Sequence, residues 1–299
     1  MDLKNQVIKQ AKNLGFDLIS FSNLSVDDDT QKYYLNWLKK NYNASMQYME
    51  KNIELRFDLN KLFNTYKSMI ILSLNYYQPT QKDNLGENIS IYAYGRDYHK
   101  TIKGKLKKII NFLKENNIKA RGFTDSAPIL EKYFAEHSGI GWQGKNSLII
   151  NKKLGSYFFL AEILTDYDFG QKELATNHCG TCRKCIDACP TGAIVADKII
   201  DSNKCISYLT IEHKGNIPKE IKLNMNDLIF GCDICQQVCP WNKKVKLTKE
   251  QDFNFRYMDI QPKDILKLNE DDFNKLFQGS PIKRAGYEHF ISQINRISK

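Results

Sequence analysis

Cysteine is the residue type in this sequence with the most evident chemistry. The 299-residue chain has eight cysteines, all between Cys179 and Cys239, and the first 178 residues hold none. The first four follow the spacing Cys-x2-Cys-x2-Cys-x3-Cys-Pro. A second run, which begins at Cys232, has the same ending but lacks its first cysteine, and Cys205 lies 27 positions before it. Clustering of this kind indicates a metal centre rather than a disulfide framework, because the cytosol keeps thiols reduced.

The first run has the spacing with which bacterial ferredoxins bind two [4Fe–4S] clusters. Three of its thiolates bind one cluster, and the fourth, turned away by the following proline, ligates the other. With Cys205 completing the second run, this crossed pairing predicts two ligand sets: Cys179, Cys182, Cys185 and Cys239 for cluster 1, and Cys189, Cys205, Cys232 and Cys235 for cluster 2. Zinc is the alternative, since cysteine pairs also build tetrahedral zinc sites. Zinc, however, requires neither the full run nor a second Cys-Pro ending.

The composition is that of a globular protein, with 42% hydrophobic and 26% charged residues. No stretch approaches the roughly 20 apolar residues that a membrane span needs. The amino terminus, with Val7, Ala11 and Leu14 at helical spacing, predicts an amphipathic helix and not a signal peptide, so we expect a cytoplasmic protein without membrane contact. The net charge of +10 falls to about +6 once two clusters of about −2 each are bound. A positive charge of this size is explained equally well by a nucleic-acid partner and by a coding bias toward lysine.

Apolar patterns before the cysteines predict a mixed domain of strands and helices. Residues 1–65 are expected to be helical, and the strongly apolar run 67–77 to be a buried strand. Later patterns predict helices at 101–116 and 127–137 and strands at 120–124, 146–151 and 156–164. Strands and helices interleaved in this way predict an α+β or α/β layer domain.

Three parts are expected along the chain, in a fold of the α+β class. Residues 1–168 form the mixed domain, residues 169–245 a ferredoxin-like domain with an insertion at 206–231, and residues 246–299 a helical and polar tail. A plain ferredoxin needs no such insertion. Inserted loops often carry function, and a solvated spacer is an equal alternative.

Two other segments have residue types that could bind a ligand. Residues 139–146 match the G-x-G-x-x-G spacing and, with Asn146 in place of Ser or Thr, a phosphate-binding loop. Both motifs need a strand before them and a helix after them. Here a helix precedes and a strand follows, so a tight glycine turn is favoured. Asp97 and His99 are similar to a cobalt-ligating loop whose glycine comes two positions earlier than Gly104, and a polar loop histidine is the favoured interpretation.

Asp125 is a candidate for either capping or catalysis. It stands in Phe-Thr-Asp-Ser-Ala-Pro, just before an expected helix with Pro128 in its first turn, as N-cap residues do. A carboxyl group at the centre of a domain could also donate a proton. The residues alone favour capping and leave catalysis open.

Several segments carry a resemblance to a known family, and it runs through nearly the whole chain. They are Tyr94-Gly95-Arg96-Asp97-Tyr98-His99, Asp125-Ser126-Ala127-Pro128, Gly139-Ile140-Gly141-Trp142 with Lys145-Asn146, Gly155-Ser156-Tyr157 through Ala161-Glu162, the first cysteine run, Cys205 to Thr210, and Phe230-Gly231-Cys232 to Pro240. Together they resemble the epoxyqueuosine reductases, the cobalamin-dependent iron–sulfur enzymes of queuosine synthesis in tRNA.

The resemblance implies a nitroreductase-like domain that holds base-off cobalamin against the ferredoxin-like domain, which delivers electrons to cobalt. The implied substrate is epoxyqueuosine at the wobble position of tRNA, and the epoxide oxygen leaves as water to give queuosine. We expect a monomer supplied by an external low-potential electron donor. The matching residues are Asp125 for the proton donor; Arg56, Asp125, Lys145 and Asn146 for cobalamin contacts; and His213 and Lys214 for a segment near tRNA.

One departure and two alternatives accompany the resemblance. Longer family members continue into a carboxy-terminal helical-repeat domain that helps grip tRNA, whereas this chain stops fifteen residues after Arg284. We therefore expect a natural short form or a truncated chain, in which the lysine-rich surface carries more of the tRNA binding. The alternatives are a reductive dehalogenase-like enzyme, whose relatives usually carry a twin-arginine signal that this amino terminus lacks, and an iron–sulfur electron carrier without its own substrate.

Overall fold

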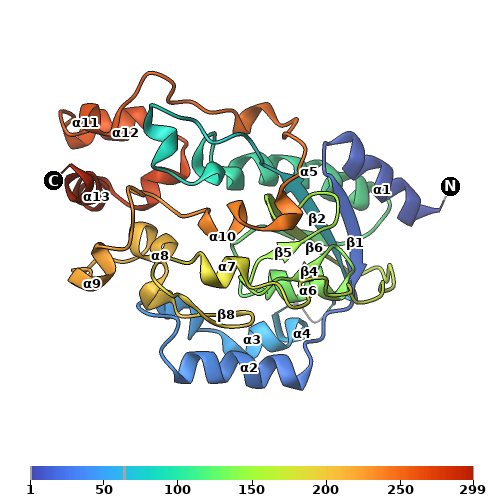
Figure 1. The fold of residues 1–299 in the computed structure, drawn as a ribbon. Coiled ribbons are helices and arrows are strands. Elements are labelled where there is room, and N and C mark those ends of the chain that lie inside the picture. The colour runs from blue at the N-terminus through green and yellow to red at the C-terminus, as the bar shows by residue number, and fades with distance from the viewer. Residues whose placement is uncertain (1, 63–64, 299) are drawn as a thin grey trace.

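A four-stranded sheet forms the centre of the computed structural model, which describes residues 2–62 and 65–298 (Figure 1). The strands lie in the order β1 (Leu18–Ser22), β2 (Ser68–Asn75), β6 (Phe158–Thr165) and β3 (Ala120–Phe123). Neighbouring strands all pair antiparallel. The sheet therefore has the α+β arrangement, and the parallel α/β alternative is wrong.

Strand β2 confirms the prediction of a buried strand at 67–77. All eight of its residues are buried, because β1 and β6 flank it and packed layers cover both of its faces. Its side chains alternate between the two faces: Leu72 and Leu74 belong to one core cluster, and Met69 and Ile71 belong to the other. This separation follows from the two-residue period of a strand.

Strand β1 contradicts the expectation that residues 1–65 are helical. Its sequence, Leu-Ile-Ser-Phe-Ser, lacks an apolar alternation because Ser20 and Ser22 are buried along with Phe21. The Ser20 hydroxyl donates to the carbonyl oxygen of Ser138, and the backbone of β1 pairs with β2. An edge strand stabilised by such tertiary contacts leaves little periodic signal in the sequence.

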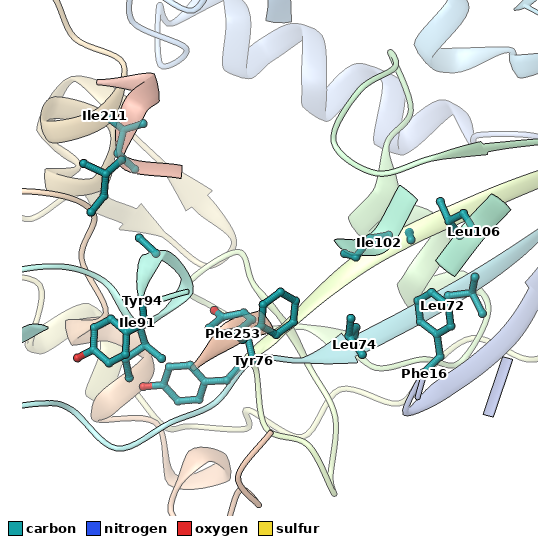
Figure 2. Packing of buried hydrophobic residues seen from close by; sticks show 14 of the residues in the cluster. Phe16, Leu72, Leu74, Tyr76, Ile91, Tyr94, Ile102, Leu106, Ile211 and Phe253 are labelled. Atoms are coloured by element: carbon teal, nitrogen blue, oxygen red, sulfur yellow. The ribbon is translucent and has the colours of Figure 1, made fainter. Parts of the chain in front are cut away.

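Helices cover both faces of the sheet (Figure 1). Those before β2 are α1 (Leu3–Asn13), α2 (Asp28–Lys39), η1 (Gln47–Met49), α3 (Ile53–Phe57) and α4 (Leu59–Leu62). Helix α5 (Tyr98–Glu115) confirms the predicted helix at 101–116 and packs with α1 on one face. Its residues Ile102 and Leu106 lie in the same core cluster as Leu72 of β2 (Figure 2). Helix α6 (Glu131–His137) packs on the other face and begins later than the 127 expected.

Asp97 and His99 form the amino-terminal cap of α5. The Asp97 carboxylate accepts a hydrogen bond from the His99 backbone N–H at 3.0 Å and lies 2.9 Å from His99 Nδ1. An Asp that satisfies one of the first unpaired N–H groups of a helix is a common cap. The pair is thus a structural feature of α5, in line with the polar interpretation.

Short helices and strands make up the rest of the chain between β2 and residue 242. They are η2 (Leu85–Glu87), η3 (Ile91–Ala93), β4 (Trp142–Gln143), β5 (Ile149–Ile150), α7 (Lys184–Asp187), β7 (Ile194–Ala196), β8 (Ile199–Ile200), η4 (Ser202–Lys204), α8 (Ile206–Ile211), α9 (Lys219–Lys222), α10 (Ile234–Gln237) and η5 (Pro240–Asn242).

The insertion at 206–231 folds as a small packed unit. Within the insertion, Leu209, Ile217 and Met225 form part of a separate core cluster. The hydroxyl of Tyr208 accepts a hydrogen bond from the Ser45 N–H at 3.0 Å, so the solvated-spacer alternative is wrong.

The carboxy-terminal segment is helical as predicted but is packed into the main core. It contains η6 (Gln251–Phe253), α11 (Pro262–Ile265), α12 (Glu270–Leu276), η7 (Pro281–Arg284) and α13 (Tyr287–Ile297). Phe253, Phe273, Phe277 and Phe290 are buried in the same cluster as β2 and α5, and the ring of Phe253, labelled in Figure 2, has its centroid 5.2 Å from that of Phe159 on β6. The description of this segment as polar is therefore wrong. None of the helices in the described residues is both long and apolar enough to cross a membrane.

Replacing Phe290 with alanine is expected to lower the free energy of unfolding by about 3–5 kcal/mol, because the cavity cannot fully collapse. The Phe290 side chain is completely buried, with ring centroids 5.6 Å from Phe273 and 5.4 Å from Phe277. Denaturant unfolding of the anaerobic protein measures the change. The exposed Asn295 on the same helix gives the control N295A, for which we expect a change within about 0.5 kcal/mol.

Candidate iron–sulfur and active site

The four cysteines predicted for cluster 1 line one cavity of about 230 Å³. All eight cysteine thiols in the described residues are free of disulfides. The two cysteine runs wrap α7 and α10, which contact each other, and place Cys185 on α7 and Cys235 on α10. Two short helices in contact therefore bring the two sequence motifs together.

Mutual electrostatic effects divide the eight thiols into two sets. The pKa of Cys239 is raised by burial and then by the nearby Cys179 and Cys182. The pKa of Cys185 is raised by burial, then by Cys179 and then by Cys239. In the other set, burial raises the pKa of Cys232 to about 12, with contributions from Cys205 and Cys189; burial and then Cys232 and Cys205 raise the pKa of Cys235. These sets are the two that the crossed pairing predicts, which supports that pairing.

Backbone and indole N–H groups point at two of the cysteine sulfurs. Trp142 Nε1 donates to Cys179 Sγ at 3.4 Å, and the Ala193 N–H donates to Cys189 Sγ at 3.3 Å. Donors of this kind stabilise the negative charge of cluster thiolates. In residues 2–62 and 65–298, no group of three His, Cys, Asp or Glu side chains is arranged to hold a single metal ion. The thiols and their N–H donors fit two clusters.

The glycine-rich segment 139–146 is a β-hairpin turn, as predicted. Strands β4 and β5 pair antiparallel across it, and no helix follows. A Cβ on Gly141 would lie 2.3 Å from the Ile150 carbonyl oxygen, so only glycine permits this close backbone approach. The phosphate-binding interpretation lacks the helix amino terminus that it requires.

Lys145 and Asn146, predicted as cobalamin contacts, lie in this turn, beside the cysteines. Both line the cavity of the cluster 1 cysteines. Lys145 Nζ is 3.2 Å from the Asp197 carboxylate. The buried Asn146 side chain donates to the Cys235 carbonyl oxygen at 3.4 Å. The hairpin therefore places both side chains at the cluster 1 cavity, and Asn146 also reaches a cysteine of the second set.

Asp125 lies on the loop between β3 and α6 and does not cap α6. That helix begins at Glu131, with Leu130 in the N-cap position, so the capping interpretation is wrong. The Asp125 backbone has a φ of +48°, a left-handed conformation uncommon outside glycine. Tyr98 Oη donates to Asp125 Oδ2 at 2.8 Å, and the Asp125 N–H donates to Glu131 Oε1 at 2.6 Å. The carboxyl group is exposed to solvent but held by neighbours on both sides.

Charged residues that the sequence analysis did not identify surround Asp125. The Lys132 side chain is exposed at the surface, but desolvation by the protein around its ammonium group lowers its pKa, against the charges of Asp125 and Glu131 and then of Cys235 and Cys205. Lys132 is thus within electrostatic range of both Asp125 and the second cysteine set. Its position directly after Glu131 on α6 gave no sequence signal, because an exposed lysine is an ordinary feature of a helix surface.

A second group of side chains lies near Asp125. It consists of Tyr48 before β2, Glu212 of the insertion and Arg284 of the carboxy-terminal segment. Arg284 Nε is 2.7 Å from Glu212 Oε1. Burial raises the pKa of Tyr48 to about 12, with Glu212 and Asp125 adding to the rise. Burial lowers the pKa of Arg284, but Glu212 and then Tyr48 and Asp125 outweigh it and raise this pKa. Four segments far apart in the chain therefore border one site.

Arg56 and the segment at 213–214 complete the set of predicted residues. Arg56 is 8% exposed, and its Nη2 donates to the Tyr48 carbonyl oxygen at 2.7 Å, while its buried Nε has no partner. An unpaired buried donor is costly unless a ligand accepts from it. His213 is within 3.5 Å of the Tyr208 hydroxyl, and Lys214 Nζ donates to the Ala285 carbonyl oxygen at 2.6 Å.

The α+β sheet domain and its paired cysteine sets define an iron–sulfur oxidoreductase. Residues 178–242 match the family model of a 4Fe-4S double cluster binding domain, which removes the zinc alternative. Residues 56–126 match the model described as "Epoxyqueuosine reductase QueG, DUF1730". The epoxyqueuosine reductase of Cellulophaga algicola is 44% identical over 282 residues, covering 93% of this chain and 92% of that protein. The chain therefore belongs to the epoxyqueuosine reductase family.

Solved structures of the family agree with this assignment. An epoxyqueuosine reductase crystallised with an epoxyqueuosine-modified tRNA-Tyr stem loop has a TM-score of 0.89 at 28% identity, covering 98% of this chain and 80% of that chain. The Bacillus subtilis enzyme, with its catalytic aspartate loop swung out of the active site, has a TM-score of 0.90 at 28% identity over the same shares.

Proposed function

We propose that this protein reduces epoxyqueuosine in tRNA to queuosine. Its family and the tRNA-bound relative support the proposal. The observation that carries it is the position of Asp125: its exposed carboxyl group accepts from Tyr98 Oη at 2.8 Å, and Lys132 is within electrostatic range of Asp125 and of Cys205 and Cys235. A proton donor and an electron-carrying cluster thus border one site. Reduction of the epoxide to the alkene consumes two electrons and two protons, and the epoxide oxygen leaves as water.

The space between Asp125 and the second cysteine set is the proposed site of cobalamin. When bound, cobalamin supplies a cobalt-centred nucleophile for the epoxide. Arg56 fits a ligand there because its buried Nε has no protein partner. Lys145 and Asn146 are proposed contacts on the side of the cysteines.

Asp125 is the proposed source of the proton for the leaving oxygen. Tyr98 donates to one carboxyl oxygen and orients the group, while Glu131 holds the backbone N–H of the same residue. General acid catalysis by a positioned carboxyl group contributes about 10²–10⁴-fold to a rate. The left-handed backbone at Asp125 is a strained conformation of the kind found at functional sites.

Electrons are proposed to pass through the two clusters in the crossed arrangement, with Cys179, Cys182, Cys185 and Cys239 on cluster 1 and Cys189, Cys205, Cys232 and Cys235 on cluster 2. Cluster 2 is the one whose cysteines act on Lys132 beside Asp125. We propose it as the immediate electron source for the cofactor. We further propose that the protein is a cytoplasmic monomer supplied by an external low-potential electron donor. Its proposed parts are a nitroreductase-like domain at 1–168, a ferredoxin-like domain at 169–245 and the carboxy-terminal segment 246–299.

Anaerobic turnover tests the function. The reconstituted protein is incubated with cobalamin, a low-potential reductant and epoxyqueuosine-containing tRNA, and the digested nucleosides are analysed by mass spectrometry. Loss of one oxygen from the nucleoside, only when cobalamin is present, is the expected result. No conversion by protein that holds both clusters and a corrinoid would overturn the substrate assignment and favour the dehalogenase-like or electron-carrier alternatives.

Binding of tRNA is expected to weaken linearly, on logarithmic axes, as salt rises, because each phosphate contact releases counterions. Lys214 is exposed and belongs to the segment proposed to contact tRNA. K214Q should reduce the slope by about 0.7–0.9, the share of one phosphate contact. The control is K9Q on α1, which lies on the opposite side of the molecule from α9 of the insertion (Figure 1). Titrations at several salt concentrations measure both slopes, and an affinity indifferent to salt would contradict the proposal.

A further inference from the structure

Glu162 is a buried carboxyl group that the proposed reaction does not use. It lies on β6 opposite Ile71 of β2 and Phe123 of β3, and its side chain is completely inaccessible to solvent. Neither of its carboxyl oxygens has a hydrogen-bond donor within the described part of the chain. An ionised carboxylate in such surroundings is strongly unfavourable. Its environment therefore requires an explanation.

The neighbour of the Glu162 carboxyl group is a second carboxyl group, that of Glu131 at the start of α6. Two carboxylates in contact have no proton to share and repel each other, whereas an acid and a carboxylate form a strong hydrogen bond. A single proton on Glu162 removes its charge and gives the pair a hydrogen bond in which Glu162 donates and Glu131 accepts. This arrangement accounts for the absence of any other donor to Glu162.

Glu131 connects this pair to the proposed proton donor. Its Oε1 accepts the backbone N–H of Asp125 at 2.6 Å, at the residue whose φ is +48°. A left-handed Asp persists only where its surroundings hold it. The carboxylate of Glu131 accepts that backbone N–H, and the Glu162 side chain in turn contacts Glu131.

We propose that Glu162 and Glu131 form an acid–carboxylate pair that shares one proton and fixes the Asp125 loop in position for proton donation. Both are positioning residues, since they act through Asp125. The inference rests on the proposed function for its link to turnover, but the shared proton itself does not. The shared proton requires no further reactant, because it stays within the pair.

The charges around the pair agree with retention of that proton. Burial, and then the charge of Glu131, raises the pKa of Glu162 well above its ordinary value, with Asp125 adding to the rise. Burial and then Asp125 raise the pKa of Glu131 to about 7, against hydrogen bonds from the Asp125 N–H and the Glu162 side chain and then the charge of His99, which lower it. Lys132 is the cation next to Glu131 on α6. The pair is therefore expected to lose its shared proton only above neutral pH.

Infrared spectroscopy of the anaerobic protein tests the pair without any substrate. A protonated-carboxyl band is expected in the wild-type protein at neutral pH, and it should disappear as the pH is raised. E162Q should lack this band. The matched control is E136Q: Glu136 lies on the same helix as Glu131 but accepts from the Gln143 N–H at 2.9 Å and pairs with Lys198 at 3.2 Å, so its loss should leave the band unchanged.

Turnover as a function of pH tests the positioning role. E162Q should keep kcat within about threefold of the wild-type value, because its amide still donates to Glu131. Its rate should also stay constant over the pH range in which the wild-type pair loses its proton. E162L removes the donor and should lower kcat by roughly tenfold or more with little change in KM, the effect of a misplaced catalytic group. A wild-type protein without the band, or E162L with full kcat, would overturn the inference. A band that behaves as expected in a protein that does not turn over epoxyqueuosine would instead refute the proposed substrate alone.

Discussion

Replacement of Asp125 with asparagine is expected to slow epoxyqueuosine reduction by about 10²–10⁴-fold, the usual contribution of a general acid. Asparagine keeps the shape of the side chain and can still accept the hydrogen bond from Tyr98 Oη, but it has no acidic proton for the leaving oxygen. Its backbone N–H still reaches Glu131, so the loop should keep its conformation. Single-turnover kinetics with mass spectrometry of the nucleosides measure the rate.

The control for this variant is Ser126→Ala on the same loop. Ser126 is also exposed, and its hydroxyl accepts only a long hydrogen bond of 3.5 Å from the Thr124 N–H. We expect its rate within about threefold of the wild type, as for surface changes away from the chemistry. Iron content and tRNA affinity should be unchanged in both variants. A D125N protein that keeps the wild-type rate would exclude Asp125 as the proton donor.

Pairs of cysteine variants are expected to separate the two clusters by iron content. With two [4Fe–4S] clusters the wild type holds about eight irons. Under the crossed pairing, Cys189 and Cys205 belong to the same cluster, so C189A/C205A should keep about four irons. Cys185 belongs to the other cluster, so C185A/C205A should keep almost none. Iron analysis and electron paramagnetic resonance of the reduced proteins measure the outcome.

An uncrossed pairing gives a different pattern in the same experiment. Cys189 would then bind with Cys179, Cys182 and Cys185, and C189A/C205A would lose both clusters. The matched control is C179A/C185A, which removes two ligands of one cluster under either pairing and should keep about four irons. All three double variants should lose turnover, because electrons would no longer reach the cofactor site.

The double-cluster domain was predictable because the spacing of its cysteines is a local property. A cluster bound by residues two or three positions apart imposes its geometry on a short stretch of chain, and this constraint is visible in the sequence. The same holds for β2 and α5, whose apolar runs show the periods of a strand and a helix. The assignment of Cys205 depended on counting ligands, and the effects of Cys205 on Cys232 and Cys235 support it.

The failures of sequence reasoning have a common physical cause, which is contact between distant segments. Ser20 and Ser22 are buried in β1 by pairing with β2, so no apolar period marks that strand. Asp125 is not followed directly by a helix, because the loop first takes a left-handed turn stabilised by Glu131. The phenylalanines of the carboxy-terminal segment lie among charged residues in the sequence, and only packing against β2 and α5 shows them as core.

The sequence by itself determined the iron–sulfur class of cofactor, the segment that holds it and the main strand and helix of the sheet domain, since each depends on spacing within a short segment. Only the tertiary structure decided which groups surround Asp125. Lys132 and Arg284 lie within electrostatic range of it, Glu212 pairs with Arg284, and Glu162 acts on it through Glu131. A glutamate within an apolar strand is a weak signal until the absence of any other donor is seen, and that requires the packed structure.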